Sequence, residues 1–176
     1  MKKLTTGSND FCLLHLDRPV RDVPIYEVAT SVTAGDAIIV GYGVSTPGFP
    51  QEGAGTQREG LVDITSVSSS GSGVDIYITG RRTGTYQNAC NGDSGGPIFV
   101  TKAGGSGGDL VVGGVTSRGA GFCPLNSQGI YTSAVYRDNA NLIRTSTREW
   151  LGVAEEVVPG MFPFFLKKKC LHEMKI

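Results

Sequence analysis

The sequence predicts an all-β protein organised as one small antiparallel barrel of six strands, followed by a C-terminal helix. Glycine accounts for 26 of the 176 residues and charged residues for only 18%, a composition that favours many short strands joined by turns over a disordered chain. From Ala37 onward, six apolar or alternating segments are separated by turns rich in glycine and serine. Six such strands are enough to close a Greek-key barrel.

Each expected strand has its own pattern. The first, in residues 35–43, is an apolar run closed by glycines. The next two, in residues 61–67 and 74–79, alternate apolar and polar side chains, as half-buried antiparallel strands do. Three further segments complete the set, at residues 98–101, 110–117 and 129–132.

Two elements flank these segments. Residues 9–20 predict a short strand that begins at Asp10 and ends in a turn with Pro19. Residues 139–151 carry apolar side chains at nearly helical spacing, which predicts an amphipathic helix docked on the barrel. The side chains that set this spacing are Leu142, Ile143, Trp150 and Leu151.

The overall charge favours no anionic partner. The formal net charge is zero, with 16 basic and 16 acidic residues, so we expect neither nucleic acid nor an anionic membrane as partner. Residues 1–8 begin with positive charge but lack the apolar stretch of a signal peptide. The most apolar segment, residues 157–166, is about half the length that a bilayer requires. We also expect no cofactor and no metal ion.

The chemistry-bearing segment is a glycine-rich turn around one serine. Gly92 and the pair Gly95-Gly96 bracket Ser94 with residues that lack a Cβ, so the backbone can take unusual dihedrals there. This arrangement predicts a nucleophile, Ser94, and an oxyanion hole formed by the N–H groups of Gly92 and Ser94. The alternative is a glycine-rich hairpin turn with an incidental serine.

The six residues from Gly92 to Pro97, Gly-Asp-Ser-Gly-Gly-Pro, resemble the signature of the chymotrypsin-like (trypsin-like) serine endopeptidases. The resemblance runs from about Asn9 to Leu151. It implies the second barrel of a two-barrel hydrolase that cleaves polypeptides through an acyl-enzyme on Ser94.

The resemblance also implies a triad carboxylate, at Asp10. Without it, Asp10 would be interpreted as a turn or cap residue. The chain contains two histidines, His15 and His172. His15 would lie about 16 Å along the strand from Asp10, and His172 lies near the C-terminus, so we expect neither to act as the catalytic base.

The simplest interpretation is a truncated, inactive protease chain that begins at an internal methionine and lacks most of the first barrel. We divide it into a remnant and connector (1–24), the second barrel with its helix (25–152) and an unassigned tail (153–176). The family pairs the aspartate before the serine with a newly cut N-terminal amine, and that segment is not in this sequence. We therefore expect an unpaired Asp93 and a disordered oxyanion loop.

The resemblance also implies a substrate site. Ser117, Arg118 and Gly119 match the edge strand that pairs with an extended peptide, while Asn88 matches the base of the specificity pocket, with Gly119 and Gly129 on its walls. An uncharged base argues against strict specificity for lysine or arginine. Arg118 replaces the family's usual aromatic residue, and it either favours acidic neighbours in the substrate or is simply a solvated arginine.

The four cysteines predict one disulfide. Cys90 lies in the serine loop and Cys123 in the segment expected beside it, so we predict that these two are bonded, which indicates a secreted or extracytoplasmic protein. Cys12 lies in an apolar run and is expected to be a buried free thiol. Cys170, in the basic tail, has no evident mate.

Two other interpretations compete with the serine endopeptidase. One is a non-catalytic trypsin-like pseudo-protease that acts as a binding or regulatory module. The other is an unrelated small β-barrel. The expected partners are a polypeptide substrate and the missing first-barrel segment.

Overall fold

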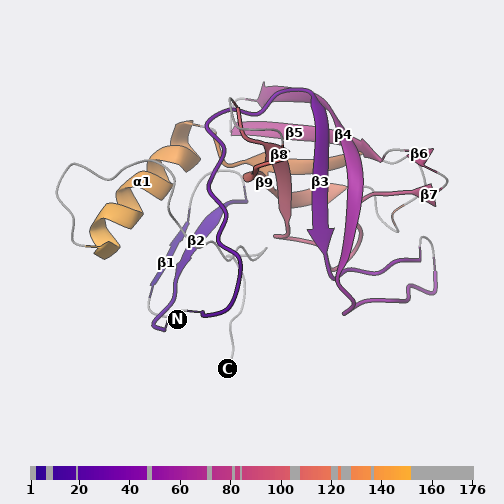
Figure 1. Ribbon diagram of the computed structural model, residues 1–176, viewed down its shortest axis with the longest axis horizontal. Helices are drawn as coiled ribbons and strands as arrows, with labels where there is room; N and C mark the ends of the chain where they lie inside the picture. The colour runs from indigo at the N-terminus through magenta and orange to yellow at the C-terminus, as the bar shows by residue number, and fades with distance from the viewer. Residues whose placement is uncertain are drawn as a thin grey trace.

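The computed structural model describes residues 3–6, 10–18, 20–46, 49–70, 73–80, 82–83, 85–103, 108–119, 123, 128–135 and 137–151. Its main feature is a closed barrel of six strands in the order β10-β5-β4-β3-β8-β9 (Figure 1). All six neighbouring pairs are antiparallel, so the expected fold class is confirmed. The strands are β3 (Gly35–Gly41), β4 (Arg58–Ser70), β5 (Gly73–Gly80), β8 (Pro97–Thr101), β9 (Leu110–Gly119) and β10 (Gly129–Ser133).

Strand β4 is longer than its side-chain pattern predicts. It continues beyond Val67 through a serine-rich segment to Ser70, where it pairs with Gly73 of β5. The ladder depends on backbone hydrogen bonds, so it needs no apolar side chain at its end. The β4–β5 register shifts between Ile64 and Ser66, which marks a bulge of the kind that bends barrel strands.

The barrel interior is filled by one aliphatic cluster. Inward-facing side chains alternate along each strand and pack against those of the strands opposite. On β9, Gly114 is required because a Cβ there would lie 2.5 Å from the Thr132 carbonyl oxygen of β10. The buried members of the cluster include Ile39, Val62, Ile64, Ile76, Ile78, Ile98, Val100, Val111 and Tyr131.

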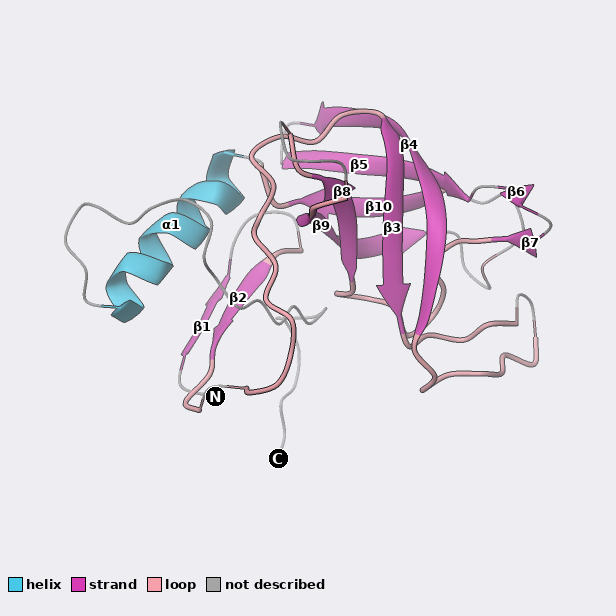
Figure 2. Cartoon of the chain, viewed as in Figure 1, coloured by secondary structure: helices cyan, strands magenta, loops and turns pink. Residues whose placement is uncertain are grey.

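A second cluster attaches the remaining elements to one flank of the barrel. There, β1 (Lys3–Thr6) and β2 (Cys12–His15) form a two-stranded antiparallel sheet, and α1 (Arg137–Leu151) lies on the same side (Figure 2). The expected docking helix is therefore confirmed, and it begins two residues earlier than its apolar spacing suggests. The cluster contains Phe11, Leu13, Val115, Ala134 and Ile143.

Sequence patterns did not predict three of the short strands. β1 pairs only with β2, and β6 (Arg82–Thr83) pairs only with β7 (Thr85–Tyr86). Strands of two to four residues are too short to show the period-two alternation that identifies a strand in sequence. None of the described helices is long and apolar enough to cross a membrane.

Cys12 departs from expectation. Its side chain is buried, as predicted, but it is disulfide-bonded and not a free thiol. An apolar neighbourhood indicates burial, but it does not reveal which distant segment folds against the strand. Cys170 and the rest of the 153–176 tail lie outside the described residues.

Candidate active site

The serine loop is held against strand β9 by backbone hydrogen bonds. Gly95 N–H donates to the Thr116 carbonyl (2.9 Å), and Thr116 N–H donates to the Gly96 carbonyl (2.8 Å). Within the loop, Gly96 N–H donates to the Asp93 carbonyl at 2.9 Å. The turn requires glycine, since the residue two before Ser94 has φ +98° and the one after it φ +82°. Ser94 thus lies at a tightly fixed bend.

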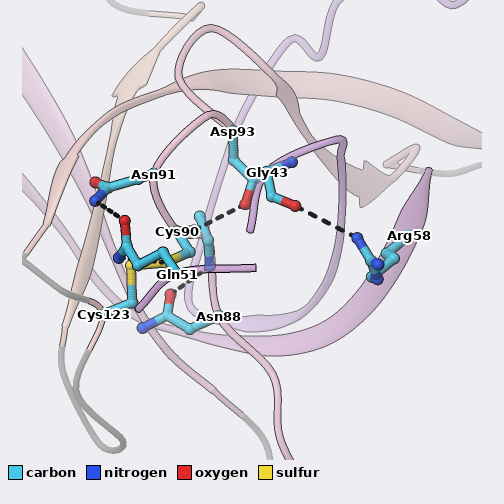
Figure 3. The surroundings of a disulfide bond; sticks show 9 residues. Gly43, Gln51, Arg58, Asn88, Cys90, Asn91, Asp93 and Cys123 are labelled. Atoms are coloured by element: carbon cyan, nitrogen blue, oxygen red, sulfur yellow. Dashed lines mark hydrogen bonds between the residues drawn. A yellow bond between two sulfur atoms is a disulfide. The ribbon is translucent and has the colours of Figure 1, made fainter. Parts of the chain in front are cut away.

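The Asp93 carboxylate has two hydrogen-bond partners, contrary to the expectation of an unpaired charge. Its Oδ1 accepts from Gly43 N–H (2.7 Å), and its Oδ2 accepts from Cys90 N–H (2.8 Å; Figure 3). Gly43 must be glycine, because a Cβ there would lie 2.6 Å from Asp93 Cγ. The expectation is wrong because the two backbone amides offset the desolvation of the carboxylate. They also order the loop, which was expected to be disordered.

Asp10 lies beside Ser117 of β9. Ser117 Oγ donates to Asp10 Oδ2 at 3.1 Å, and Ser117 and Ser94 line the same cavity. Asp10 has φ +59°, a left-handed conformation that aspartate tolerates better than most residues. The structure therefore brings Asp10 to the edge of the cavity that Ser94 lines.

His15 lies away from this cluster. Its ring stacks on Trp150 of α1, with ring centroids 4.8 Å apart and planes 8° from parallel. This agrees with the expectation that Asp10 does not orient His15. His172 lies outside the described residues.

A polar cavity of about 160 Å³ opens beneath Ser94. Five residues predicted from the sequence to bind substrate line it together, and Tyr131 and Thr116 line it as well. Asn88 is held in place because its Oδ1 accepts from Ala89 N–H at 2.8 Å. A Cβ on Gly129 would lie 2.8 Å from the same Oδ1, so the wall opposite Asn88 must be glycine. The five predicted residues are Asn88, Ser117, Arg118, Gly119 and Gly129.

Tyr131 is a cavity residue that sequence reasoning missed. Its side chain is fully buried. Burial raises the pKa of the Tyr131 hydroxyl well above its usual range. The nearby Thr116 hydroxyl donates to the Gly96 carbonyl at 3.1 Å, and its oxygen can still accept a hydrogen bond from the Tyr131 hydroxyl. The usable signal was strand alternation, because Tyr131 follows Gly129 by two residues and so faces the same way.

Arg118 is partly exposed to solvent, and it also has a partner within the protein. Its guanidinium forms an ion pair with Asp75 of β5, a carboxylate whose side chain is only 7% exposed. The Tyr77 hydroxyl donates to the same carboxylate at 3.5 Å. The Arg118 side chain is 52% exposed, so this arginine is both ion-paired and in contact with solvent.

The predicted disulfide between Cys90 and Cys123 is present, with Cα atoms 5.4 Å apart (Figure 3). It ties the start of the serine loop to the cavity rim, since both cysteines line the cavity. Next to it, Asn91 Nδ2 donates to Gln51 Oε1 at 2.8 Å. The rim is thus fixed covalently and by a side-chain contact.

A second and larger hollow, of about 490 Å³, is lined in part by residues 92–97 of the serine loop. Ser94 contributes to both hollows. The lining is mostly apolar and includes Tyr26, which packs on Phe99 with ring centroids 4.6 Å apart.

Strand β9 has an open edge next to the smaller cavity. Its pairing with β8 reaches Val115, opposite Pro97. Beyond this point residues 117–119 belong to β9 but pair, in the described part of the chain, only with β10. Such an edge can accept an extended peptide as an additional strand. Within the described ranges, no group of three His, Cys, Asp or Glu side chains could hold a metal ion.

Comparison with known proteins agrees with this geometry. Glucanase inhibitor protein 4 of Phytophthora infestans is 27% identical over 128 residues, which make up 68% of this chain and 49% of that protein. The chain therefore spans about half the length of this relative. The profile described as Trypsin matches residues 2–139. Because that match covers most of the sequence, the chain belongs to the trypsin family.

Proposed function

We propose that this chain is a non-catalytic binding module of the trypsin family, which holds an extended polypeptide segment in the cavity beneath Ser94 and along the open edge of β9. The observation that carries the proposal is the position of His15. The His15 ring stacks on Trp150, while the Asp10 carboxylate accepts a hydrogen bond from the Ser117 hydroxyl.

A serine hydroxyl is a weak nucleophile near neutral pH and needs an adjacent base within hydrogen-bond reach. In the described ranges, the one histidine is His15, and its ring is packed against α1. Ser94 therefore has the loop of a nucleophile without a described imidazole to take its proton.

The same loop suits binding. The bonds from Asp93 to Gly43 and Cys90, together with the disulfide, hold the cavity wall in one conformation. A preformed site spends less free energy on ordering when a partner binds. The open edge of β9 adds main-chain hydrogen bonds that any extended peptide can make.

The relative suggests a first partner class to test. Its name describes an inhibitor of a glucanase, so we propose that a glucanase is bound by this chain through a surface segment. Cys12, Cys90 and Cys123 are all disulfide-bonded, which supports an oxidising, extracytoplasmic setting.

A second candidate is a serine endopeptidase in which another segment supplies the imidazole. The Ser117 bond to Asp10 and the ordered loop around Ser94 favour it. In that case the carboxylate would orient the imidazole and the loop amides would stabilise the oxyanion.

Two assays on the purified chain separate the candidates. A serine-directed fluorophosphonate should leave Ser94 unlabelled, with active trypsin as the positive control. A titration against a purified glucanase should reduce glucan hydrolysis, and Ser94→Ala should inhibit equally well. Rapid stoichiometric labelling at Ser94, with peptide cleavage lost in Ser94→Ala, would replace the binding module by the endopeptidase.

A further inference from the structure

We propose that Asn91, next to Cys90 in the serine loop, is a site of spontaneous deamidation, which converts its neutral side chain into a carboxylate at the cavity rim. The inference goes beyond the proposed function and holds whether or not the cavity binds a polypeptide. Asn91 lines the cavity and is exposed, as is Gly92 after it. Solvent water, which the reaction needs, therefore reaches both residues.

The reaction is an attack by a backbone nitrogen on the side chain before it. The Gly92 nitrogen bonds to Asn91 Cγ, the bond between Cγ and Nδ2 breaks, and Nδ2 leaves as ammonia with the proton from Gly92 N–H. The product is a cyclic succinimide. Water then opens the ring at either of its carbonyl carbons. Opening at Cγ gives aspartate, and opening at the main-chain carbonyl carbon gives isoaspartate.

The first observation is the nitrogen that attacks. Gly92 N–H donates no hydrogen bond to any of the described residues, so no such bond has to break before its nitrogen reacts. Glycine also has no Cβ to hinder the approach of Asn91 Cγ. The fold requires glycine at this position, because φ is +98° and an added Cβ would lie 3.0 Å from Gly43 Cα. The turn thus fixes the reactive neighbour of Asn91.

The second observation is how Asn91 is held. Its Nδ2 donates to Gln51 Oε1 at 2.8 Å (Figure 3). Its carbonyl oxygen accepts from Val44 N–H at 3.0 Å. The contact with Gln51 is exposed, so water competes for both partners and the net strength of the bond is small. These bonds slow the reaction without preventing it, because exposed contacts open locally while the rest of the fold stays intact.

Conversion changes the cavity rim in charge and in backbone length. Either product places a carboxylate among lining residues of which none, in the described ranges, carries one. Isoaspartate also adds a methylene to the main chain, which then runs through Cβ and Cγ. The turn closed by Asp93 N–H and the Cys90 carbonyl (3.0 Å) must then accommodate an extra atom. Deamidation is therefore a one-way change in the serine loop that accumulates with the age of the chain.

The test is peptide mapping by mass spectrometry of the folded, unmodified chain in mildly alkaline buffer, beside a synthetic peptide of residues 88–96 with its cysteine alkylated. We expect Asn91 to give both products at most about thirtyfold more slowly than in the peptide, because two hydrogen bonds restrain it. Asn88 lines the same cavity but precedes alanine, so it is the internal control and should stay intact. Each converted chain gains a negative charge over the formal net charge of zero, so anion exchange separates it.

Variants test the restraint and the ring closure. Gln51→Ala removes the side-chain contact and should accelerate conversion about fivefold, as the loss of one hydrogen bond would give. Thr65→Ala is the matched control, since it removes an exposed hydrogen bond on β4 and should leave the rate unchanged. Asn91→Gln keeps the carboxamide on a longer stem that cannot close the same ring, so conversion at this position should stop.

The outcomes are distinct. If Asn91 is intact after about a hundred half-lives of the peptide reaction, the inference is overturned, and this measurement depends on no variant. Equal conversion at Asn88 and Asn91 also overturns it, because the Gly92 nitrogen would then not determine the site. An unchanged rate in Gln51→Ala overturns the restraint assigned to Gln51. None of these results bears on whether the cavity binds a polypeptide, which the glucanase titration decides.

Discussion

The hydroxyl of Ser117 donates to the carboxylate of Asp10 at 3.1 Å, across 107 positions of sequence. The bond joins the segment before β2 to the open end of β9. Ser117 is only 2% exposed, so the carboxylate is the partner that keeps this buried hydroxyl satisfied. The contact therefore fixes the flanking segment to the cavity that Ser94 lines.

Ser117→Ala should lower the free energy of unfolding by about 1 kcal/mol, the usual net value of one hydrogen bond. Urea denaturation measures it. Ser66→Ala, at an exposed position of β4, is the matched control and should stay within about 0.5 kcal/mol of the unmodified chain. Equal midpoints for the two variants would show that the Asp10 contact adds nothing.

Arg118→Gln should cost more, about 2 kcal/mol, because it leaves the buried Asp75 carboxylate without its cation. We reduce the value expected for a fully buried pair because the arginine side chain is half-exposed. The double variant with Asp75→Asn should recover part of the loss, which a double-mutant cycle by urea denaturation measures. Purely additive effects would mean that the two side chains do not interact in solution.

Sequence reasoning located the serine loop because its chemistry is local. Six consecutive residues specify the turn, and the same local argument placed Cys90 near Ser94. The Arg118–Asp75 pair could not be found in this way, since it reaches from β9 to β5 across the intervening β10. The β9–β10 register shifts between Ile130 and Tyr131, and the pattern of residue types does not predict such a shift.

The Asp93 prediction failed for a related reason. The family resemblance suggested that an N-terminal amine pairs with Asp93. The partners that the fold supplies are instead backbone N–H groups, which carry no charge and leave no mark on the sequence. The two glycines at positions 41 and 43 were visible in the sequence, but their use as a close-fitting cradle for a carboxylate depends on the path of the chain after β3. The two glycines indicated that another group could approach the backbone closely. Only the fold shows that this group is the Asp93 carboxylate.

Tyr131 predicts a pH effect on stability. Burial raises the pKa of its hydroxyl in the folded protein, whereas in the unfolded chain the hydroxyl ionises near its ordinary value of about 10. The folded state thus binds the proton more tightly, so this contribution is complete below about pH 10 and is lost as pH rises above that value. Chemical denaturation at several pH values should show Tyr131→Phe gaining stability relative to the unmodified chain above pH 10. A constant difference from about pH 7 to 11 would contradict the buried hydroxyl.

Gly43→Ala tests how the serine loop is held. The added Cβ would lie 2.6 Å from Asp93 Cγ and equally close to its Oδ2, so the carboxylate must shift away from Gly43 N–H and Cys90 N–H. Overpacking of this kind costs about 1–3 kcal/mol, and the loss should appear first as faster amide exchange in residues 90–96. Gly119→Ala is the control for stability, since its Cβ would come no closer than 3.6 Å to the Gln128 carbonyl oxygen. If Gly43→Ala leaves exchange in the serine loop unchanged, the Asp93 bonds do not hold the loop, and the preformed cavity on which the binding role depends would need another support.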